Sequence, residues 1–381
     1  MGSFFKKMDL LFKKEGATTY KVGFNAGDCL FSNFYNYASF RGRREEWPEF
    51  IEHFLHQKKI DKIFLFGDCR YYQSMAIKEA MKIGIDVYVF EEGYVRPNYI
   101  TMEKYGVNNY SRISRDPNFY SSLELKTLPK PRNTKQSKFK LVTSSAIYYL
   151  VSNLLSFRYP NYQHHRDFSA LKEFFYGVRG VWRKYVYKLS EAGYLEKIEG
   201  ELSKKYYFVP LQTYNDFQIL EHSSYKSVEK FIIEVLESFA TFAPKDKILI
   251  FKHHPVDRGR KNYKKFIMEQ AELFGVEKRI EVIHDVYLPS CLQHAIGTVT
   301  INSTVGMSSL FHATPTITLG NAIYDIEGLT CKGMSLDEFW HKQITPDEEL
   351  YNKYRNYLIE TTQLNGSFYG EMPKFDFSEK E

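Results

Sequence analysis

The sequence predicts an α/β protein made of two Rossmann-like parallel-sheet domains that face a central cleft. Short apolar runs alternate with stretches of helical periodicity in the first third of the chain, and the same alternation resumes from about residue 206. A less regular middle separates these halves. A chain of 381 residues has room for two domains, because one domain usually takes roughly 100 to 200 residues. We therefore expect one domain over residues 1–200 and a second over residues 201–381.

The first half contains three short apolar runs that indicate strands. The predicted strands cover residues 20–25, 63–66 and 87–90, and predicted helices cover residues 47–57 and 72–82. Polar residues follow each strand: Gly27-Asp28-Cys29, Gly67-Asp68-Cys69-Arg70 and Glu91-Glu92-Gly93-Tyr94. Because ligands bind at the carboxyl ends of strands in open parallel sheets, we expect these clusters to lie beside a binding site.

The middle of the chain is basic and then amphipathic. Residues 126–140 hold six basic residues, two prolines and no acid, which is typical of a solvated linker. In residues 141–157 the apolar side chains fall on one helical face: Ile147, Leu150, Val151, Leu154 and Leu155. Two interpretations fit this pattern. In the first, these segments dock on an anionic membrane surface, where each basic residue contributes about 1 kcal/mol of binding free energy. In the second, they form a loop that leads into a buried helix.

The second half repeats the alternation of short strands and helices. The predicted strands cover residues 207–211, 248–251, 280–283, 298–301 and 316–319, and the predicted helices cover residues 228–242, 263–274 and 304–312. Short apolar strands separated by helices favour a parallel sheet that is covered on both faces.

The composition excludes several classes of protein. The 52 Lys and Arg against 46 Asp and Glu give a net charge of +6, which suits an anionic substrate or membrane surface and is too small to indicate nucleic-acid binding. The four cysteines are scattered without a CxxC pair, so neither a disulfide scaffold nor a zinc site is indicated, and a reducing cytoplasm fits. No secretion signal opens the chain, and its longest uncharged run, residues 141–157, is too short and too polar to indicate a spanning helix.

Adjacent carboxylates end one predicted strand of the first half. Glu91 and Glu92 lie too close to ionise independently, so one pKa is expected to rise and to suit general acid/base catalysis. Neighbours on a strand point to opposite faces, so at most one of the two faces the cleft. A solvated acid pair in a strand-end turn is the competing interpretation.

Basic residues follow one predicted strand of the second half. Lys252, His253, His254 and Pro255, with Arg258 just beyond, place imidazoles and a guanidinium where they can meet a phosphate. A metal site is a weaker interpretation, because adjacent histidines diverge and no third ligand lies at a familiar spacing. A basic surface turn is the alternative.

Two further polar loops follow strands of the second half. In residues 302–306, Ser303 or Thr304 would cap the next helix, whose free backbone N–H groups make an anion site, although capping alone explains this loop equally well. In residues 212–218, Asp216 is the only acid, and a lone Asp in a loop is more often a turn former. The chain contains no GxGxxG, HExxH or GxSxG motif.

Together these clusters resemble, in their order along the chain, the motifs of the bacterial capsule polysaccharide synthesis and export family, and within it the KpsS-type members. Each segment alone is weak evidence for membership of the family, whereas the combination of all of them is specific to it. The similar segments lie between about residue 27 and residue 340, and the main ones are Phe66-Gly67-Asp68-Cys69-Arg70, Glu91-Glu92-Gly93-Tyr94-Val95-Arg96-Pro97, Ile100-Thr101-Met102-Glu103, residues 212–218 with His222-Ser223, residues 252–259, His284-Asp285 with Leu288-Pro289, residues 301–306, and Leu319-Gly320 with Gly328-Leu329-Thr330.

The resemblance implies a GT-B glycosyltransferase that uses CMP-activated Kdo. It makes residues 1–200 the acceptor domain and residues 201–381 the CMP-sugar domain. The KpsS-type members begin a β-linked Kdo linker on (lyso)phosphatidylglycerol at the cytoplasmic face of the inner membrane. The resemblance therefore implies a peripheral location there, alongside other capsule assembly and export proteins. Room for one transferase unit supports initiation of the linker over its extension. CMP leaves as a monophosphate, so we expect no metal and no other cofactor.

The resemblance also assigns roles to single residues. His254 and Pro255 match an HP motif that contacts the CMP phosphate, and Ser303 and Thr304 match a second nucleotide-binding element. The other residues that we expect to bind the substrate or nucleotide are Asp68, Arg70, Arg96, Gln212, Lys252, His253, Arg258, Asn302 and Gly306.

The catalytic residues that the resemblance implies are carboxylates. Glu91-Glu92-Gly93 matches an acidic motif that supplies the acid/base, for which we favour Glu92 over Glu91. Asp216 matches the loop acid that serves as nucleophile in related β-Kdo transferases. Stereochemistry gives Asp216 independent support. CMP-Kdo is itself a β-glycoside, so a β-linked product requires retention, and retention through a covalent intermediate needs a carboxylate opposite the leaving group.

Two alternatives stay open at this point. One is a non-catalytic capsule export or scaffold protein, which would not need Glu92 and Asp216 together. The other is a transferase that uses another CMP-sugar, such as sialic acid, and differs only in the pocket for the sugar tail.

Overall fold

The computed structural model describes residues 2–163, 170–216, 219 and 223–375. They form two compact units, of which the first contains residues 1–110, 127–170 and 358–381 and the second contains residues 111–126 and 171–357. This division differs from the predicted boundary at residue 200. The difference arises because the C-terminal strand pairs with a strand of the first unit, while helices that precede residue 200 pack in the second.

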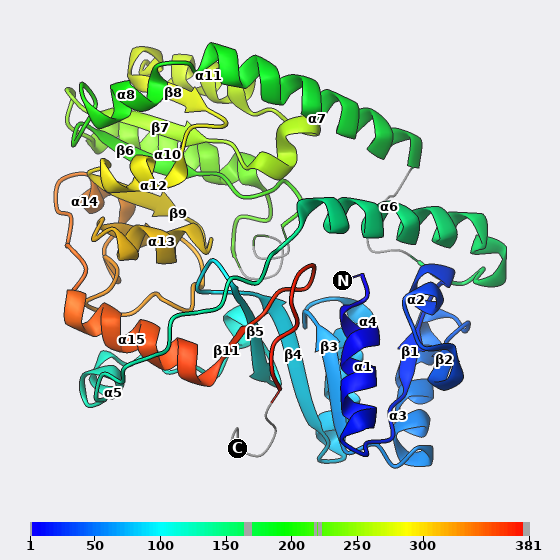
Figure 1. Cartoon of the computed structure of the whole chain (residues 1–381). Coiled ribbons are helices and arrows are strands. Elements are labelled where there is room, and N and C mark those ends of the chain that lie inside the picture. Colours follow the sequence, from blue (N-terminus) through cyan, green and yellow to red (C-terminus); the bar gives the residue numbers. More distant parts are fainter. Residues whose placement is uncertain (1, 164–169, 217–218, 220–222, 376–381) are drawn as a thin grey trace. The chain divides into compact units, whose positions relative to one another are not determined.

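The second unit is a doubly wound Rossmann-like sheet (Figure 1). Its strands are β6 (Tyr206–Pro210), β7 (Ile248–Lys252), β8 (Ile280–Ile283), β9 (Gly297–Thr300) and β10 (Thr316–Thr318). All five are parallel, in the order β10-β9-β6-β7-β8. The chain winds outward from β6 to β8 on one side, then crosses to β9 and continues to β10. The five predicted strands and the parallel pairing are therefore confirmed.

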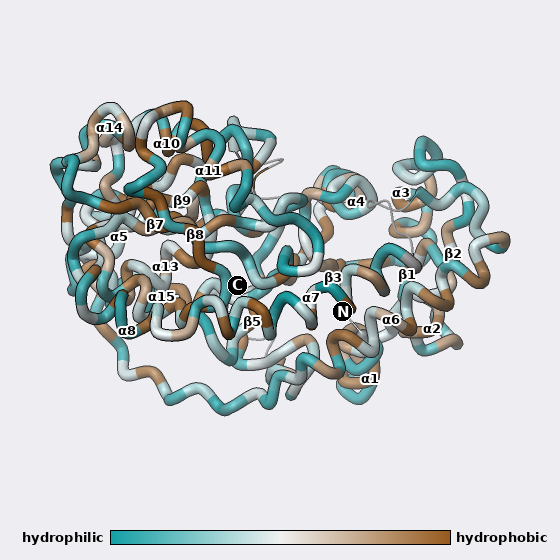
Figure 2. Tube along the Cα trace, turned by 90° about the horizontal axis from the view of Figure 1, so that it is seen from above, coloured by the Kyte–Doolittle hydropathy of each residue, from teal (hydrophilic) through white to brown (hydrophobic). Residues whose placement is uncertain are grey.

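Helices cover both faces of this sheet, as burial of a parallel sheet requires. Figure 2 shows the hydrophobic strands β7 and β8 between α10 and α11 on one side and α8 and α13 on the other. The helices of the second unit are α5 (Pro117–Ser121), α7 (Ala170–Ser190), α8 (Tyr194–Glu199), α10 (Val228–Phe242), α11 (Lys264–Leu273), α12 (Leu288–Gln293), α13 (Val305–Phe311), α14 (Leu336–Phe339) and α15 (Glu348–Thr361), the last of which continues into the first unit from residue 358.

Strand β6 is central to the sheet, and its side chains are buried on both faces. All of its residues are buried, and successive side chains point to opposite faces. Tyr207 and Val209 join one core cluster with α10 and α11, whereas Tyr206 and Phe208 join another with α8 and α12. A continuous apolar run is what a strand that is covered on both faces requires.

The first unit has a mixed sheet, in which the two predicted strands are parallel and two further strands, which the sequence did not predict, are antiparallel to their neighbours. Its strands are β3 (Lys62–Phe66), β4 (Asp86–Glu92), β5 (Tyr99–Lys104) and β11 (Gln363–Asn365), in the order β11-β5-β4-β3. Only β3 and β4 are parallel, and β5 is antiparallel to both of its neighbours. The connection from β4 to β5 is residues 93–98, too short for a parallel crossover, which takes about a dozen residues.

The predicted strand at residues 20–25 lies outside this sheet. It forms β1 (Lys21–Gly23), which pairs in parallel only with β2 (Tyr37–Ser39). The helices of the first unit are α1 (Phe4–Lys14), α2 (Ala26–Leu30), α3 (Trp47–Gln57), α4 (Tyr71–Lys82) and α6 (Lys138–Leu154). Helix α6 therefore begins three residues before the predicted segment. Throughout the described ranges, no helix is long and apolar enough to cross a membrane.

Both ends of the chain meet on one face of the mixed sheet. Val87 and Val89 of β4 pack with α3 and α4, whereas Tyr88 and Phe90 pack with α1 and with the segment after β11. In that second cluster the ring of Phe368 packs edge-on against Phe4, with 4.8 Å between the ring centroids. The C-terminal segment thus completes the core that the first residues of the chain begin.

We expect Phe368→Ala to lower the free energy of unfolding of the first unit by about 3 to 5 kcal/mol, because it leaves a cavity beneath β4. Urea denaturation followed by circular dichroism would measure this change. Phe34→Ala is the matched control in the same unit, since that ring is exposed, and should change the free energy by less than about 0.5 kcal/mol. Equal effects of the two substitutions would contradict the role given to the C-terminal segment.

Candidate functional site

The strand order of the second unit places two polar loops beside each other. The chain reverses direction across the sheet between β6 and β9, and ligands bind at such a switch point, outside the carboxyl ends of the strands. Gln212 follows β6, and its Nε2 donates hydrogen bonds to Asn302 Oδ1 at 3.1 Å and to Asp216 Oδ2 at 3.2 Å. The backbone N–H of Asn302 donates in return to Gln212 Oε1 at 3.4 Å. The structure thus brings three predicted site residues together.

The loop after β9 is held by a tyrosine. Tyr324 Oη donates a hydrogen bond to the carbonyl of Ser303 at 2.5 Å. A Cβ on Gly306 would lie 2.1 Å from that same Oη, so only glycine fits there. Of the two predicted caps, Ser303 accepts a hydrogen bond from the N–H of Val305 at 3.2 Å, whereas the side chain of Thr304 makes no capping bond. Gly306 is therefore part of the support for this loop.

The two adjacent histidines after β7 have different surroundings. His253 is buried, and its Nε2 accepts a hydrogen bond from the N–H of Tyr263 at 3.0 Å. Burial lowers the pKa of His253 to about 3, so its ring stays neutral. His254 is only partly buried, and its Nδ1 accepts from the N–H of Val256 at 3.2 Å. In its neutral form this ring carries its proton on Nε2, where it can donate to a ligand.

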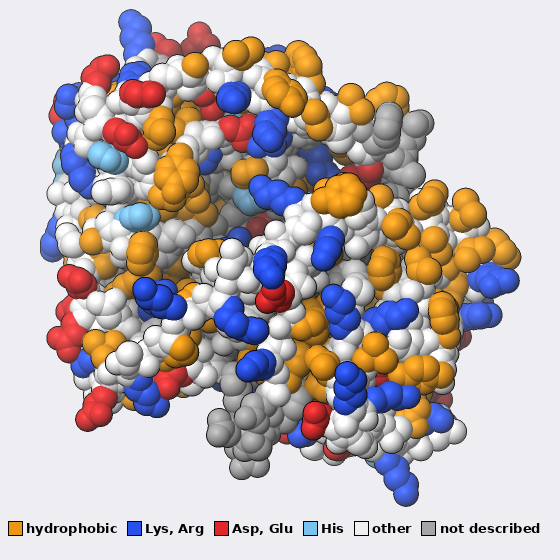
Figure 3. Space-filling view, viewed as in Figure 1, with side chains coloured by type: hydrophobic (Ala, Val, Ile, Leu, Met, Phe, Trp, Pro, Cys, Tyr) orange, Lys and Arg blue, Asp and Glu red, His pale blue; other side chains and the backbone are white. Residues whose placement is uncertain are grey.

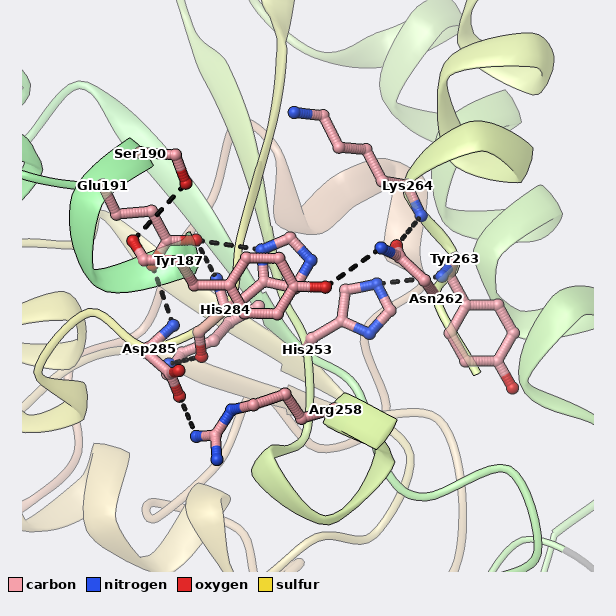
Figure 4. A network of polar contacts seen from close by, with 11 residues as sticks. Tyr187, Ser190, Glu191, His253, Arg258, Asn262, Tyr263, Lys264, His284 and Asp285 are labelled. Carbon is pink, nitrogen blue, oxygen red and sulfur yellow. Dashed lines mark hydrogen bonds and ion pairs between the residues drawn. The ribbon is translucent and has the colours of Figure 1, made fainter. Parts of the chain in front are cut away.

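Lys252 and His253 stabilise the conformation of the loops at this site. The ammonium of Lys252 is buried and donates to the carbonyl of His284, and burial lowers its pKa. The rings of Tyr187, His284 and His253 form a stacked column, with centroids 3.7 Å and then 4.8 Å apart (Figure 4). These residues fix the loops after β7 and β8 to each other and to α7.

Glu191, just after α7, clamps the loop that follows β8. Its carboxylate accepts hydrogen bonds from the backbone N–H groups of His284 and Asp285, at 2.7 and 2.8 Å, and pairs with His284 Nδ1 at 2.9 Å. Burial opposes ionisation of Glu191, but these hydrogen bonds outweigh it and hold its pKa below the ordinary value. Asp285 in turn forms an ion pair with Arg258.

Several buried polar atoms at this edge have no hydrogen-bond partner within the described residues. They are Asp257 Oδ1, Arg258 Nε, His284 Nε2 and Asp285 Oδ2. Buried polar atoms are normally paired, so a group of them at the carboxyl ends of two adjacent strands is a place where a polar ligand would supply the missing bonds. Over the same residues, no cluster of three or more His, Cys, Asp or Glu side chains has the arrangement of a metal site.

Asp257 is a buried carboxylate that the sequence did not single out. Its Oδ2 accepts a hydrogen bond from the N–H of Tyr214 at 3.0 Å, which ties the loop containing Asp216 to the loop after β7. Burial raises the pKa of Asp257 to about 6, and the nearby charge of Asp216 adds to this. His284 and Asp285 lie in one of the segments that resemble the family, and their place directly after a predicted strand could have assigned them to the site. Glu191 carries no such signal, because it reaches the site from a helix end.

The second group of predicted residues belongs to the first unit, at the carboxyl ends of β3 and β4. Burial raises the pKa of Glu91 to about 7, and the charge of Glu92 contributes. Asp68 is buried, and its Oδ2 accepts from the N–H of Val107 at 2.7 Å. Arg96 donates to the carbonyl of Gly93 at 3.1 Å. The structure thus makes Asp68 and Arg96 supports of their own loops.

Gly93 and Arg70 complete this group. A Cβ on Gly93 would lie 2.3 Å from the carbonyl oxygen of Tyr99, so the turn that follows Glu92 needs glycine. The charge of Arg70 acts to lower the pKa of Glu91, and burial outweighs it. The result is one carboxyl that titrates near neutral pH at the end of a rigid strand.

The family described as capsule polysaccharide biosynthesis protein matches residues 61–369. The chain is 40% identical over 369 residues to the "Capsule polysaccharide export protein KpsS" of Escherichia coli, covering 97% of this chain and 95% of the relative. It is 37% identical over 389 residues to the "Capsule polysaccharide modification protein LipB" of Neisseria meningitidis serogroup A, covering 98% and 90%.

Solved structures are more distant. The β-Kdo 2,7 transferase KpsC of Thermosulfurimonas dismutans shares 14% identity over 90% of this chain and 89% of that chain, with a TM-score of 0.43. A likeness at this level says nothing about activity.

We expect the free energy of unfolding of the first unit to fall as pH rises from about 4.5 to about 7. The unfolded chain releases the Glu91 proton near the ordinary pKa of 4.5, whereas the folded chain keeps it up to about 7, so folding binds a proton in this window. The loss amounts to about 3 kcal/mol. Urea denaturation of the native protein and of Glu91→Gln across this range would isolate the contribution as a difference.

Glu92→Gln is the control for that titration, since it changes the neighbouring carboxylate. It should leave most of the pH dependence in place. A Glu91→Gln protein with the same pH dependence as the native protein would show that Glu91 ionises normally.

Proposed function

Because the chain belongs to the capsule polysaccharide biosynthesis family, we propose that it is a retaining β-Kdo glycosyltransferase that transfers the first Kdo from CMP-Kdo to (lyso)phosphatidylglycerol. The observation that carries this proposal is the cluster of Gln212, Asp216 and Asn302 at the switch point of a Rossmann-like sheet. It combines a carboxylate with the place where such sheets bind nucleotides. The product would start the linker of a capsular polysaccharide.

CMP-Kdo would bind at the carboxyl edge of the second unit's sheet. The partly buried His254 would turn its Nε2–H to the phosphate, and Ser303 and Thr304 lie partly buried in the loop after β9. Arg258 and His284 have buried nitrogens without partners in the described part of the chain, which a polar ligand would pair. The proposal includes neither a metal nor another cofactor, because CMP leaves as a monophosphate.

Two carboxylates would share the chemistry. Asp216 attacks the anomeric carbon of Kdo while the bond from that carbon to the CMP phosphate oxygen breaks, which gives a covalent glycosyl ester and free CMP. The acceptor hydroxyl then attacks the same carbon, its proton passes to a general base, and Asp216 is released. Two inversions give net retention. For the base we propose Glu91 in place of Glu92, since a pKa of about 7 suits proton transfer near neutral pH.

The acceptor is a lipid, so we propose a peripheral position at the cytoplasmic face of the inner membrane. None of the residues of α6 is buried. The helix contacts α2 through polar groups, since Asn25 Nδ2 donates to Tyr148 Oη at 2.7 Å and Ser152 Oγ donates to Asn25 Oδ1 at 3.0 Å. The apolar residues Leu150 and Leu154, which follow the basic residues 126–140 in the sequence, are exposed. This favours docking over the alternative of a buried helix.

The name of the Escherichia coli relative favours a second candidate, a non-catalytic protein of capsule export. Contacts with other capsule assembly proteins fit either function. A transferase for another CMP-sugar, such as sialic acid, is a third candidate that shares the chemistry above and differs in the sugar pocket. All three are separated by a direct assay of product.

Purified protein incubated with CMP-Kdo and lysophosphatidylglycerol should yield a lipid heavier by one Kdo, detected by mass spectrometry. Asp216→Asn and Glu91→Gln should each lower the rate by about 100-fold or more, because each removes a group that acts on the reacting atoms. Asp246→Asn, which changes an exposed carboxylate of the same unit as Asp216, should keep the native rate. A ladder of Kdo units would indicate extension instead of initiation.

The negative outcomes of this assay also differ from one another. Binding of CMP-Kdo without product would contradict the acceptor, and product from another CMP-sugar alone would contradict the donor. The absence of both binding and product would favour the export candidate.

We expect the protein to float with vesicles that contain phosphatidylglycerol, and neutralising the basic segment to weaken this binding at least tenfold. The variant replaces Lys126, Lys130, Lys138 and Lys140 with Gln, and each lysine contributes about 1 kcal/mol near an anionic surface. Vesicle flotation at low and high salt would measure the effect. Unchanged flotation of the variant would remove the docking role of this segment.

A further inference from the structure

Helix α7 exposes an apolar stripe along most of its length. The stripe consists of side chains spaced alternately three and four residues apart, which places them on one helical face. Its members are Phe175, Val178, Trp182, Tyr185 and Leu189, all of them exposed. Figure 3 shows hydrophobic side chains gathered on the surface over α7. A helix of a water-soluble protein normally turns such a face to the core.

The opposite face of α7 is held by polar contacts, so the stripe cannot turn inward. Arg179 Nε donates to the carbonyl of Gly259 at 2.6 Å, and Arg183 Nη1 donates to the carbonyl of Arg258 at 2.9 Å. One turn later Tyr187 stacks on His284. The helix is also close to its neighbour, since a Cβ on Gly259 would lie 2.0 Å from the carbonyl oxygen of Tyr176.

The charges around the stripe point to the kind of surface that covers it. Lys172, Lys184 and Lys188 are exposed on α7, and the one acid among its residues, Glu173, forms an ion pair with Arg260. The exposed side of the helix is therefore apolar and cationic. Trp182 and Tyr185 are of the residue types that concentrate at membrane–water interfaces, where the ring lies among the headgroups. Lysines beside them attract anionic lipid.

A second copy of the chain fits this face less well. In a coiled-coil dimer the residues that flank the stripe would pair across the interface. Lys188 occupies one of those flanking positions, and the acid among the residues of α7, Glu173, already pairs with Arg260. Helix α6 of the first unit independently carries the same combination, with exposed Phe139, Leu150 and Leu154 and no acid. An anionic membrane surface suits each of these two helices by the same chemistry.

We propose that the apolar stripe of α7 lies in the headgroup region of an anionic membrane and is a second docking element, in the nucleotide-binding unit. An amphipathic helix in this position buries its apolar face at the boundary of headgroups and acyl chains while its cations pair with the lipid. The inference concerns lipid binding and does not rest on the proposed transfer reaction. It gives the second unit a membrane contact of its own.

Tryptophan fluorescence tests this docking directly. The chain has three tryptophans, of which Trp47 and Trp340 are only 2% and 1% exposed and Trp182 is 63% exposed. With the full-length protein and vesicles of phosphatidylglycerol and phosphatidylcholine, we expect a blue shift and quenching by brominated acyl chains. Trp182→Phe should remove both signals and still bind. Vesicle-bound native protein without quenching would overturn the proposal.

A matched pair of leucines separates docking from loss of fold. Leu189 on the stripe is 79% exposed and Leu273 on α11 is 77% exposed. We expect Leu189→Glu to weaken vesicle partitioning at least about tenfold and Leu273→Glu to leave it unchanged, with native circular dichroism in both. Equal partitioning of the two variants would overturn the proposal. So would a native dimer in sedimentation equilibrium that Leu189→Glu dissociates, since the stripe would then bind a second copy.

The outcome for α7 is distinguishable from the outcome for the transfer reaction. Turnover with an acceptor dispersed in detergent should be the same for Leu189→Glu and the native protein, because that residue lies outside the site. Loss of turnover in detergent would show that Leu189 acts on the fold of the site and would count against a role confined to docking.

Discussion

Burial of β6 on both faces is the constraint on which the second unit depends. A strand in which every residue is covered must have helices on both sides of its sheet, and the chain meets this demand by winding outward from β6 in one direction and then in the other. That winding leaves Gln212 and Asn302 beside each other at the carboxyl edge. The position of the candidate site is thus a consequence of how the core is buried.

Some polar residues at this edge hold the loops in place, and others are available to act on a ligand. Lys252 and His253 are buried and form hydrogen bonds with the backbone of the loops after β7 and β8. In the first unit, Asp68 likewise accepts a hydrogen bond from the backbone, at Val107. Asp216, in the loop after β6, and His254, in the loop after β7, stay partly exposed. Preorganisation of this kind lets a few groups meet a ligand without reorganising when it binds.

Two helices show the reverse of the usual amphipathic arrangement. Helices α6 and α7 pack on their own units through hydroxyl, amide and guanidinium groups and leave apolar side chains outside. Apolar surface exposed to water costs free energy in proportion to its area, so these faces favour a second, less polar phase.

The sequence by itself determined the strands of the second unit and the polar clusters that end them, because an apolar run and the turn after it are local properties. It also placed Glu91, Asp216 and His254 among the candidates. Only the tertiary structure decided that β5 and β11 run antiparallel to their neighbours and that the C-terminal segment returns to the first unit. It also decided that His253 is buried while His254 is partly exposed, and that Glu191 reaches the site. It also decided that burial raises the pKa of Glu91. The direction of β5 follows from its short connection to β4, and each of the others depends on residues distant in the chain, whose packing sets burial and pairing.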